Sequence, residues 1–160
     1  MSQLLIRPAQ IDDAGLIVHF VTELAIYEKA EHEVQANEQH FIDTLFCEQP
    51  RAHALICELD GQAIGFAVYF YSYSTWLGKY GIYLEDLYVS PEYRGAGGGK
   101  ALLRELARIA MAEDCGRIEW SVLDWNEPAI QFYKSLGALP KEGWTIYRME
   151  GPSIGELADC

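Results

Sequence analysis

A glycine-rich run from Arg94 to Lys100 constrains the fold of this chain more than any other feature. Its sequence is Arg-Gly-Ala-Gly-Gly-Gly-Lys, and it lies between a strand-like segment, residues 82–89, and a helix-like segment, residues 100–113. Glycine has no Cβ, so the backbone of the run can approach a bulky group closely. Free N–H groups and the positive dipole end at the start of a helix favour an anion. The run therefore predicts a strand–turn–helix unit that holds a phosphate group.

The spacing of the glycines excludes two common nucleotide-binding motifs. A Walker A loop requires a glycine where this chain has Arg94 and a Ser or Thr where it has Ala101. A dinucleotide-binding fingerprint requires a third glycine, and Lys100 and Leu102 occupy the two places where it would stand. The phosphate group is therefore not expected to belong to ATP or NAD bound in these ways.

Size and charge limit the class of protein. The 160 residues, 50% of them hydrophobic, are typical of one globular domain, which we expect over residues 1–160 with a core over about 4–149. The net charge of −12 argues against nucleic acid, because a basic face supplies most of the affinity for it. The same charge favours a cationic partner, although it also serves solubility alone.

The four cysteines, Cys47, Cys57, Cys115 and Cys160, form no Cys-x-x-Cys pair and have no histidine at ligand spacing. We therefore expect reduced thiols and no bound metal. No apolar run approaches the ~20 residues of a membrane helix, and the N-terminus lacks a signal-peptide pattern. These features predict a cytoplasmic protein that binds no membrane.

Hydrophobic periodicity and turn signals predict a mixed α/β domain. Asp60-Gly61 between two apolar runs is typical of a hairpin, and Asn37 and Asn126 are suited to cap helices. We also expect Asp12 or Asp13 to cap a helix at its start, and Gly116 and Gly137 to cap helices at their ends. Strands are expected at residues 4–7, 52–59, 62–71, 82–89, 117–123 and 144–149, with helices after Asp13, after Asn37, at residues 100–113 and after Asn126.

The glycine run and its flanks together resemble the GCN5-related N-acetyltransferases, the GNAT superfamily. Arg94, Gly97 and Gly99 fit the Arg-x-x-Gly-x-Gly pattern of that family's acyl-CoA pyrophosphate loop. Residues 83–95 are similar to the strand and turn before the loop, and residues 124–138 to a later strand–helix unit. The similarity covers about residues 6–149. It implies a single-domain α/β (α+β) GNAT fold, with a mixed, mostly antiparallel sheet flanked by helices.

Within the superfamily the chain is most similar to the diamine N-acetyltransferase branch, which includes spermidine/spermine and thialysine enzymes. This similarity is carried by residues 24–28, 74–79, 83–86 and 123–126. It implies acetyl-CoA as co-substrate, a small diamine, polyamine or lysine analogue as acceptor, direct transfer in a ternary complex, and a homodimer. An acetyltransferase for protein lysines or N-termini, and a non-catalytic acyl-CoA-binding module, remain as alternatives.

The resemblance implies a donor site around the glycine run. Amides of the run would receive the pyrophosphate, with Arg94 and Lys100 supplying positive charge. Backbone groups of residues 87–89 would pair with the pantetheine arm as an added strand does, and the amide at Leu87 would steady the oxyanion. Asn126 fits a plain helix cap equally well. The expected donor-site residues are Leu87, Tyr88, Val89, Arg94, Gly95, Ala96, Gly97, Gly98, Gly99, Lys100, Asn126, Pro128 and Ala129.

The resemblance assigns Tyr133 as the general acid that protonates the leaving thiolate, and Glu85 as the base that deprotonates the amine directly or through water. From the residues alone, Tyr133 would be a packed helix tyrosine. Glu85 and Asp86 point to opposite faces of an extended strand unless a bulge intervenes.

The acceptor site is expected to combine carboxylates, which hold a distal ammonium, with aromatic faces, which add cation–π contacts. The residues that the resemblance places there are Tyr27, Glu28, Trp76, Glu85, Glu142 and Trp144. Glu119 and Ser121 are also expected there, because they lie on the next strand and can line the same cleft. Without the family, Glu28 would be a solvated carboxylate at a helix end.

Overall fold

The computed structural model describes residues 1–160, and the chain divides into two compact units, residues 1–121 and 122–160. The first unit contains a five-stranded sheet with spatial order β1-β2-β3-β4-β5. Its strands are β1 (Leu4–Pro8), β2 (His53–Leu59), β3 (Gln62–Ser74), β4 (Lys79–Val89) and β5 (Ile118–Glu119). All neighbours are antiparallel except the parallel pair β4–β5, which confirms the mixed, mostly antiparallel α/β prediction.

Local sequence signals explain why the middle strands are neighbours in space. Asp60 and Gly61 connect β2 to β3 with φ angles of 50° and 82°, and both left-handed conformations match a tight hairpin turn. β4 begins at Lys79, three residues before the predicted start, because the β3–β4 ladder continues to the pair Ser74–Lys79. The two hairpins therefore place β2, β3 and β4 side by side in the sheet, in the order in which they occur in the chain.

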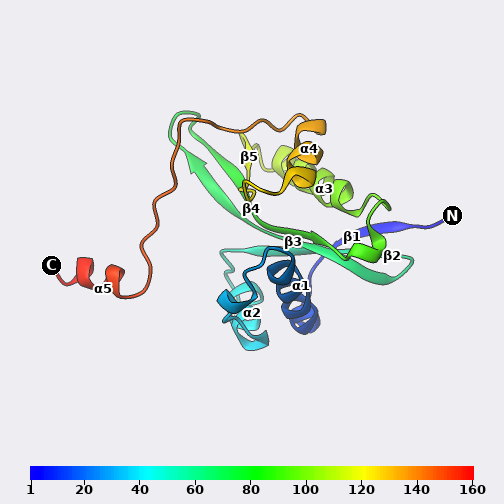
Figure 1. Cartoon of the computed structure of the whole chain (residues 1–160), viewed down its shortest axis with the longest axis horizontal. Coiled ribbons are helices and arrows are strands. Elements are labelled where there is room, and N and C mark those ends of the chain that lie inside the picture. Colours follow the sequence, from blue (N-terminus) through cyan, green and yellow to red (C-terminus); the bar gives the residue numbers. More distant parts are fainter. The chain divides into compact units, whose positions relative to one another are not determined.

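Helices cover both faces of the sheet. Helices α1 (Ala14–Tyr27) and α2 (Glu38–Leu45) lie on one face, and α3 (Gly98–Ala112) lies on the other (Figure 1). On the first face Ile17 and Phe20 pack against the sheet, and the ring of Phe20 stacks on that of Phe66 at 5.5 Å. On the other face, α3 buries Leu102, Leu103, Leu106 and Ala110, which recur at helical spacing and form one apolar stripe.

The helix caps are partly as predicted. Asn37 caps α2, since its side chain accepts a hydrogen bond from the N–H of His40. Asp13 precedes α1 but its side chain does not cap that helix. Its carboxylate instead accepts from the N–H of Gln10 at 2.7 Å and forms a two-point ion pair with Arg7. The strong Arg7 partner outcompetes the helix amides, and it holds the pKa of Asp13 below its usual value.

The end of α3 and the following strand differ from the predictions. Asp114, not Gly116, takes the left-handed conformation after α3, with φ of 53°. A Cβ at Gly116 would lie 2.7 Å from the end of the Leu77 side chain, which is exposed and would have to move. β5 ends at Glu119, four residues short of the predicted Leu123, because only Ile118 and Glu119 find partners on β4.

The second unit contains α4 (Glu127–Ser135) and α5 (Pro152–Ala158). As predicted, Asn126 caps α4 by accepting from the N–H of Ala129, and Gly137 follows the helix with φ of 88°. The strand predicted at residues 144–149 is wrong: that segment joins no sheet, and a strand requires a hydrogen-bonded neighbour. Helix α5 was not predicted.

Candidate active site

The glycine run forms a turn that ends in the first turn of α3. Gly95 and Gly97 have φ angles of 91° and 89°, which an L-residue with a side chain rarely adopts. Gly97 is the N-cap, so α3 begins at Gly98, two residues before the predicted start, and no side chain caps it. The first N–H groups of the helix consequently have no intrahelical partner, which is the arrangement that binds phosphate oxygens.

Two further glycines bring the backbone of this region close together. A Cβ at Gly98 would lie 3.3 Å from the Cys57 sulfur and 3.4 Å from side-chain atoms of Ile64 and Val89. A Cβ at Gly65 would lie only 2.5 Å from the carbonyl oxygen of Tyr88. The end of β4 therefore approaches β3 at a distance that leaves no room for a Cβ at Gly65, and the start of α3 packs tightly against side chains of the sheet.

Strand β4 has one open edge beside the glycine run. It pairs with β3 as far as Val89, but with β5 only at Ile82 and Tyr83. The backbone groups of residues 84–89 on the β5 side therefore have no strand partner. An extended ligand with amide groups can bind there as an additional strand.

A bulge in β4 changes the direction of the carboxylates. Val68 of β3 faces Asp86, and the next residue, Tyr69, faces Leu84, so Glu85 has no partner. Such an extra residue interrupts strict alternation and re-aims the side chains beside it. The sequence predicted that Glu85 and Asp86 point to opposite faces of the strand unless a bulge intervenes, and such a bulge is present.

Three carboxylates gather at this bulge. Desolvation, with the charges of Glu85 and Glu28, raises the pKa of Asp86 from its usual 3.8 to about 6. Burial also raises the pKa of Glu28, which directly follows α1, while Glu85 is exposed. None of the three forms a salt bridge. The cluster is therefore a concentration of negative charge that no salt bridge neutralises. Asp86 was not among the expected site residues, and only the register shift reveals its position.

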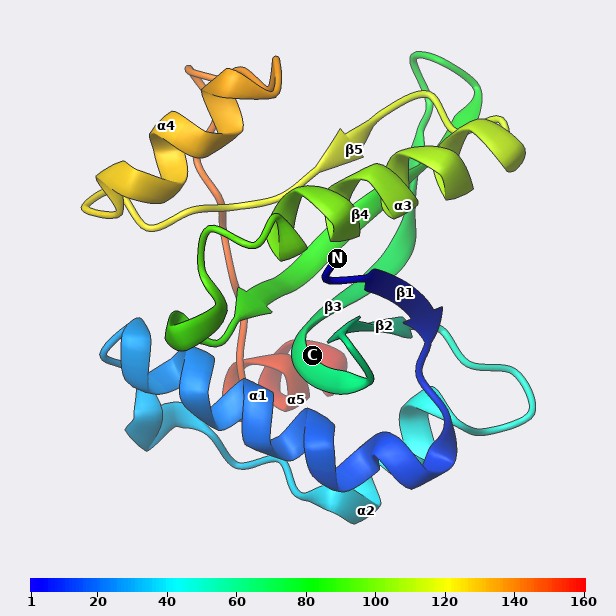
Figure 2. The same ribbon diagram turned by 90° about the vertical axis from the view of Figure 1, so that its right-hand side faces the viewer.

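The end of α1 contacts the glycine run. The guanidinium carbon of Arg94 lies 5.0 Å from the centre of the Tyr27 ring. Nearby, the Tyr88 hydroxyl donates to a Glu23 carboxylate oxygen at 3.4 Å. Figure 2 shows the turn after β4 beside the C-terminal end of α1. The positively charged part of the expected donor site is thus in contact with the helix that precedes Glu28.

The remaining predicted acceptor residues of the first unit lie apart from this cluster or have other partners. Glu119 forms a salt bridge with Arg117 at 3.0 Å, and the Ser121 hydroxyl lies 2.8 Å from that of Tyr83. Trp76 is 86% exposed in the β3–β4 turn. The stretch of β4 from Lys79 to Glu85 spans roughly 20 Å at the usual rise per residue. Within one chain Trp76 therefore does not share a site with Glu85.

The second unit carries the other predicted residues. Tyr133 lies half-buried in α4 with its ring 5.7 Å from that of Phe132. Asn126, Pro128 and Ala129 form the start of the same helix. Glu142 and Trp144 are exposed in the segment between α4 and α5. Their roles toward donor and acceptor remain predictions.

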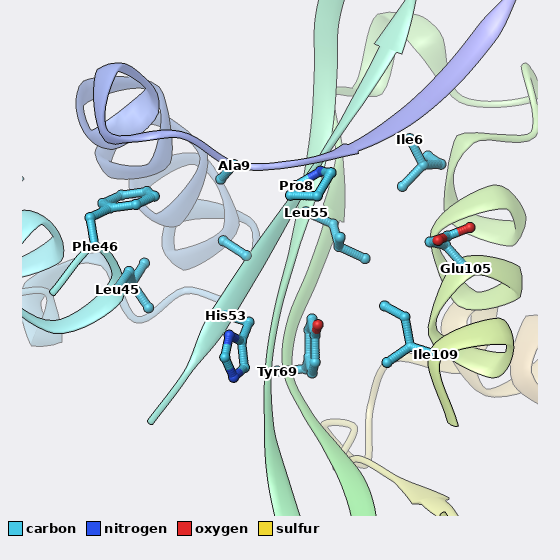
Figure 3. A pocket seen from close by; sticks show the side chains of 11 residues that line it. Ile6, Pro8, Ala9, Leu45, Phe46, His53, Leu55, Tyr69, Glu105 and Ile109 are labelled. Atoms are coloured by element: carbon cyan, nitrogen blue, oxygen red, sulfur yellow. The ribbon is translucent and has the colours of Figure 1, made fainter. Parts of the chain in front are cut away.

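A cavity of about 300 Å³ lies elsewhere in the first unit (Figure 3). His53 and Tyr69 line it from the sheet, and Glu105 and Ile109 line it from α3. None of the predicted site residues lines it. Ile109 lies roughly 16 Å along α3 from Gly98 at the helical rise per residue. The open edge of β4, and not this cavity, is the candidate active site.

Comparison with known proteins identifies the family. The model of the acetyltransferase (GNAT) family matches residues 21–138. The chain is 40% identical to a thialysine N-epsilon-acetyltransferase of Bos taurus over 99% of each chain. It is 32% identical to the human spermidine/spermine N(1)-acetyltransferase-like protein 1, over 96% of this chain and 23% of that protein. An integron cassette protein from the mobile metagenome of V. cholerae has the same fold, with a TM-score of 0.80 and 28% identity over 98% of each chain.

The chain belongs to the GNAT family, and it is an acetyl-CoA-dependent N-acetyltransferase that acts on an amine. This confirms the family and the enzyme class predicted from the sequence. No helix of the structure is long and apolar enough to cross a membrane. No group of three or more His, Cys, Asp or Glu side chains is arranged to hold a metal ion.

Proposed function

We propose that this enzyme transfers acetyl from acetyl-CoA to a primary amine of a small substrate that carries a second positive charge. A diamine, a polyamine or a lysine analogue such as thialysine has this chemistry. The observation that carries the proposal is the cluster of Glu28, Glu85 and Asp86, in which none of the carboxylates forms a salt bridge. A distal ammonium group would supply the missing charge and lower the raised pKa of Asp86.

The donor binds along β4 and the glycine run in this proposal. The open amides at the start of α3 receive the pyrophosphate, and the exposed side chains of Arg94 and Lys100 add positive charge. The pantetheine arm pairs with the open backbone of residues 87–89. This local positive charge offsets the repulsion between CoA and a chain of net charge −12.

The chemistry is a direct transfer. The amine must lose a proton before its nitrogen attacks the thioester carbon, and Glu85 accepts that proton directly or through water. The new N–C bond forms, the C–S bond breaks, and the thiolate of CoA takes a proton from Tyr133. The second proton that the nitrogen loses as the amide forms restores the Tyr133 hydroxyl group, directly or through water. An amide N–H of β4 near Leu87 stabilises the oxyanion.

Replacement of Tyr133 by Phe tests the proton donor. The ring remains, so packing beside Phe132 is retained, while the leaving thiolate loses its acid. We expect kcat to fall by about 10²-fold or more with little change in the Kd of acetyl-CoA. The matched variant Phe132→Leu changes packing without removing a hydroxyl group and should not reproduce this split. Unchanged kcat in Tyr133→Phe would remove Tyr133 from the mechanism.

The acceptor class is tested by thiol release from acetyl-CoA with putrescine, spermidine, thialysine, lysine and a lysine-containing peptide. Butylamine is the matched control, because it equals putrescine without the second amino group. We expect putrescine or thialysine to exceed butylamine in kcat/KM by about tenfold or more, the strength of a charge-assisted contact. Turnover of the peptide alone would indicate a protein acetyltransferase. CoA binding without turnover of any amine would indicate a non-catalytic module.

A further inference from the structure

The last two turns of α1 present one face to the donor loop. Phe20, Glu23 and Tyr27 are spaced by three and four residues, so they share that face. Phe20 packs near Tyr88 with ring centres 6.3 Å apart, and Glu23 accepts a hydrogen bond from the same tyrosine. Tyr27, one turn further, carries Arg94 on its ring at 5.0 Å. This face therefore contacts β4 and the turn after it, in the region of the donor site.

Arg94 has no carboxylate partner in a salt bridge, although the chain is strongly acidic. Its guanidinium therefore keeps its charge available while the aromatic ring restricts its position. A flexible arginine loses rotamer freedom when it binds a phosphate, and a side chain that is already held loses less. A stacked guanidinium also keeps its outward N–H groups free for a two-point contact with phosphate oxygens.

We propose that Tyr27 is a positioning residue for the donor: its ring holds the Arg94 guanidinium at the glycine run, ready for the CoA pyrophosphate. This assignment differs from the amine-site role that the family resemblance implies for Tyr27. It rests on the proposed function, because it requires that CoA binds at the glycine run.

The contact between Arg94 and Tyr27 also connects the donor loop with the carboxylate cluster of Glu28, Glu85 and Asp86. Tyr27 is the last residue of α1, and Glu28, a member of the carboxylate cluster, follows directly. The contact of Arg94 with the Tyr27 ring therefore links the donor loop to the helix end that precedes Glu28.

The test is calorimetric titration of CoA, without amine, into wild type, Tyr27→Leu, Tyr27→Phe, Arg94→Ala and the double variant Tyr27→Leu/Arg94→Ala. We expect Tyr27→Leu to weaken CoA by about two- to fivefold, the size of an exposed cation–π contact. Tyr27→Phe should bind CoA like wild type, because the ring and not the hydroxyl group holds the guanidinium. In the Arg94→Ala background, Tyr27→Leu should have no further effect.

Controls separate positioning from a general loss of structure. Tyr27→Gln removes the ring but keeps a good helix former, so it replaces Tyr27→Leu if the leucine variant unfolds. Tyr73→Leu removes another exposed tyrosine, far along the β3–β4 hairpin, and should leave the affinity for CoA unchanged. The KM of the amine at saturating acetyl-CoA should change less in Tyr27→Leu than the Kd of CoA.

Three results would overturn the assignment. Tyr27→Leu with wild-type CoA affinity and a raised amine KM would return Tyr27 to the amine site. Equal weakening by Tyr27→Leu with and without Arg94 would show that the ring acts through the fold and not through Arg94. Wild type that binds no CoA would overturn the proposed function and this assignment together, whereas the first two results would leave the proposed function intact.

Discussion

At the scale of single residues, the surroundings of Asp86 change the chemistry of its carboxyl group. Burial, together with the charges of Glu85 and Glu28, raises the pKa of this carboxyl to about 6. The folded form therefore binds a proton more tightly than the unfolded chain does. Stability is then lost as pH rises from about 4 to about 6, the reverse of a carboxylate held by an arginine.

The variant Asp86→Asn removes this charge at nearly constant volume. We expect it to be more stable than wild type at pH 7.5, by roughly 1–3 kcal/mol from the size of the shift. The gain should shrink as pH falls and vanish near pH 3, below the unfolded-state pKa of 3.8, where Asp86 is protonated in both states. Denaturant unfolding at several pH values measures this gain, and a gain that persists undiminished at about pH 3 would contradict the electrostatic cause.

The same variant should bind the substrate less well. The affinity of a diamine for the enzyme–CoA complex should rise in wild type as pH increases through about 6, because Asp86 becomes charged. Asp86→Asn should lose most of this dependence. Titration of putrescine into the CoA complex measures it, and identical pH profiles would exclude Asp86 from the amine site.

Two substitutions at Gly97 test whether the donor loop binds the pyrophosphate, because they differ in charge and hardly in shape. Its φ of 89° is left-handed, a conformation that Asp and Asn tolerate better than other residues. Gly97→Asp and Gly97→Asn therefore carry similar backbone strain and differ in charge. We expect Asp to weaken CoA by about tenfold more than Asn does, through repulsion of the pyrophosphate. Equal affinities would place the pyrophosphate away from Gly97.

At the scale of elements, the close contact between β3 and β4 is the feature most sensitive to substitution. Gly65→Ala would place a methyl group 2.5 Å from the Tyr88 carbonyl oxygen, so the strands must shift apart. We expect a loss of about 2–4 kcal/mol in unfolding free energy, together with weaker CoA binding. Gly155→Ala in α5 is the matched control, because nothing lies within 4 Å of its Cβ and its φ is not positive. Thermal unfolding compares the two, and equal stability would contradict the close approach.

The elements that the sequence predicted well are those fixed by local signals. Asn37 and Asn126 cap helices, and Asp60-Gly61 turns a hairpin, because each conformation is decided within a few residues. The strand at residues 117–123 is shorter than predicted, and the strand predicted at 144–149 does not form. An apolar pattern shows only that a segment is suited to a sheet. Whether it pairs depends on a neighbour that lies elsewhere in the chain.

At the scale of the whole molecule, the β3–β4 hairpin exposes a group of aromatic side chains. Tyr73, Trp76 and Tyr80 are 56%, 86% and 62% exposed. Exposed aromatic clusters are typical of protein interfaces. They favour the homodimer that the family resemblance implies, and we propose this hairpin as its interface.

The double variant Tyr73→Lys/Tyr80→Lys should therefore sediment as a monomer under conditions where wild type is a dimer, because two buried ammonium groups oppose association. Leu5→Lys is the control, because it also adds a positive charge at an exposed position, but on the edge strand β1, away from the β3–β4 hairpin. A variant that remains dimeric would move the interface away from the hairpin, and a monomeric wild type would contradict the homodimer itself.

The sequence by itself determined the strand–glycine–helix unit and most helix caps, because glycine geometry, hydrophobic period and capping are local properties. The donor class followed from the resemblance of the glycine run and its flanks to the GNAT superfamily. Tertiary structure alone decided which distant side chains meet. The bulge at Glu85 exists only in the register between β3 and β4, and it places Asp86 near Glu28. The contact of Arg94 with Tyr27 likewise requires α1 to pack beside the glycine run. Such pairings depend on how elements far apart in the chain pack, and the spacing of residues along the chain does not encode them.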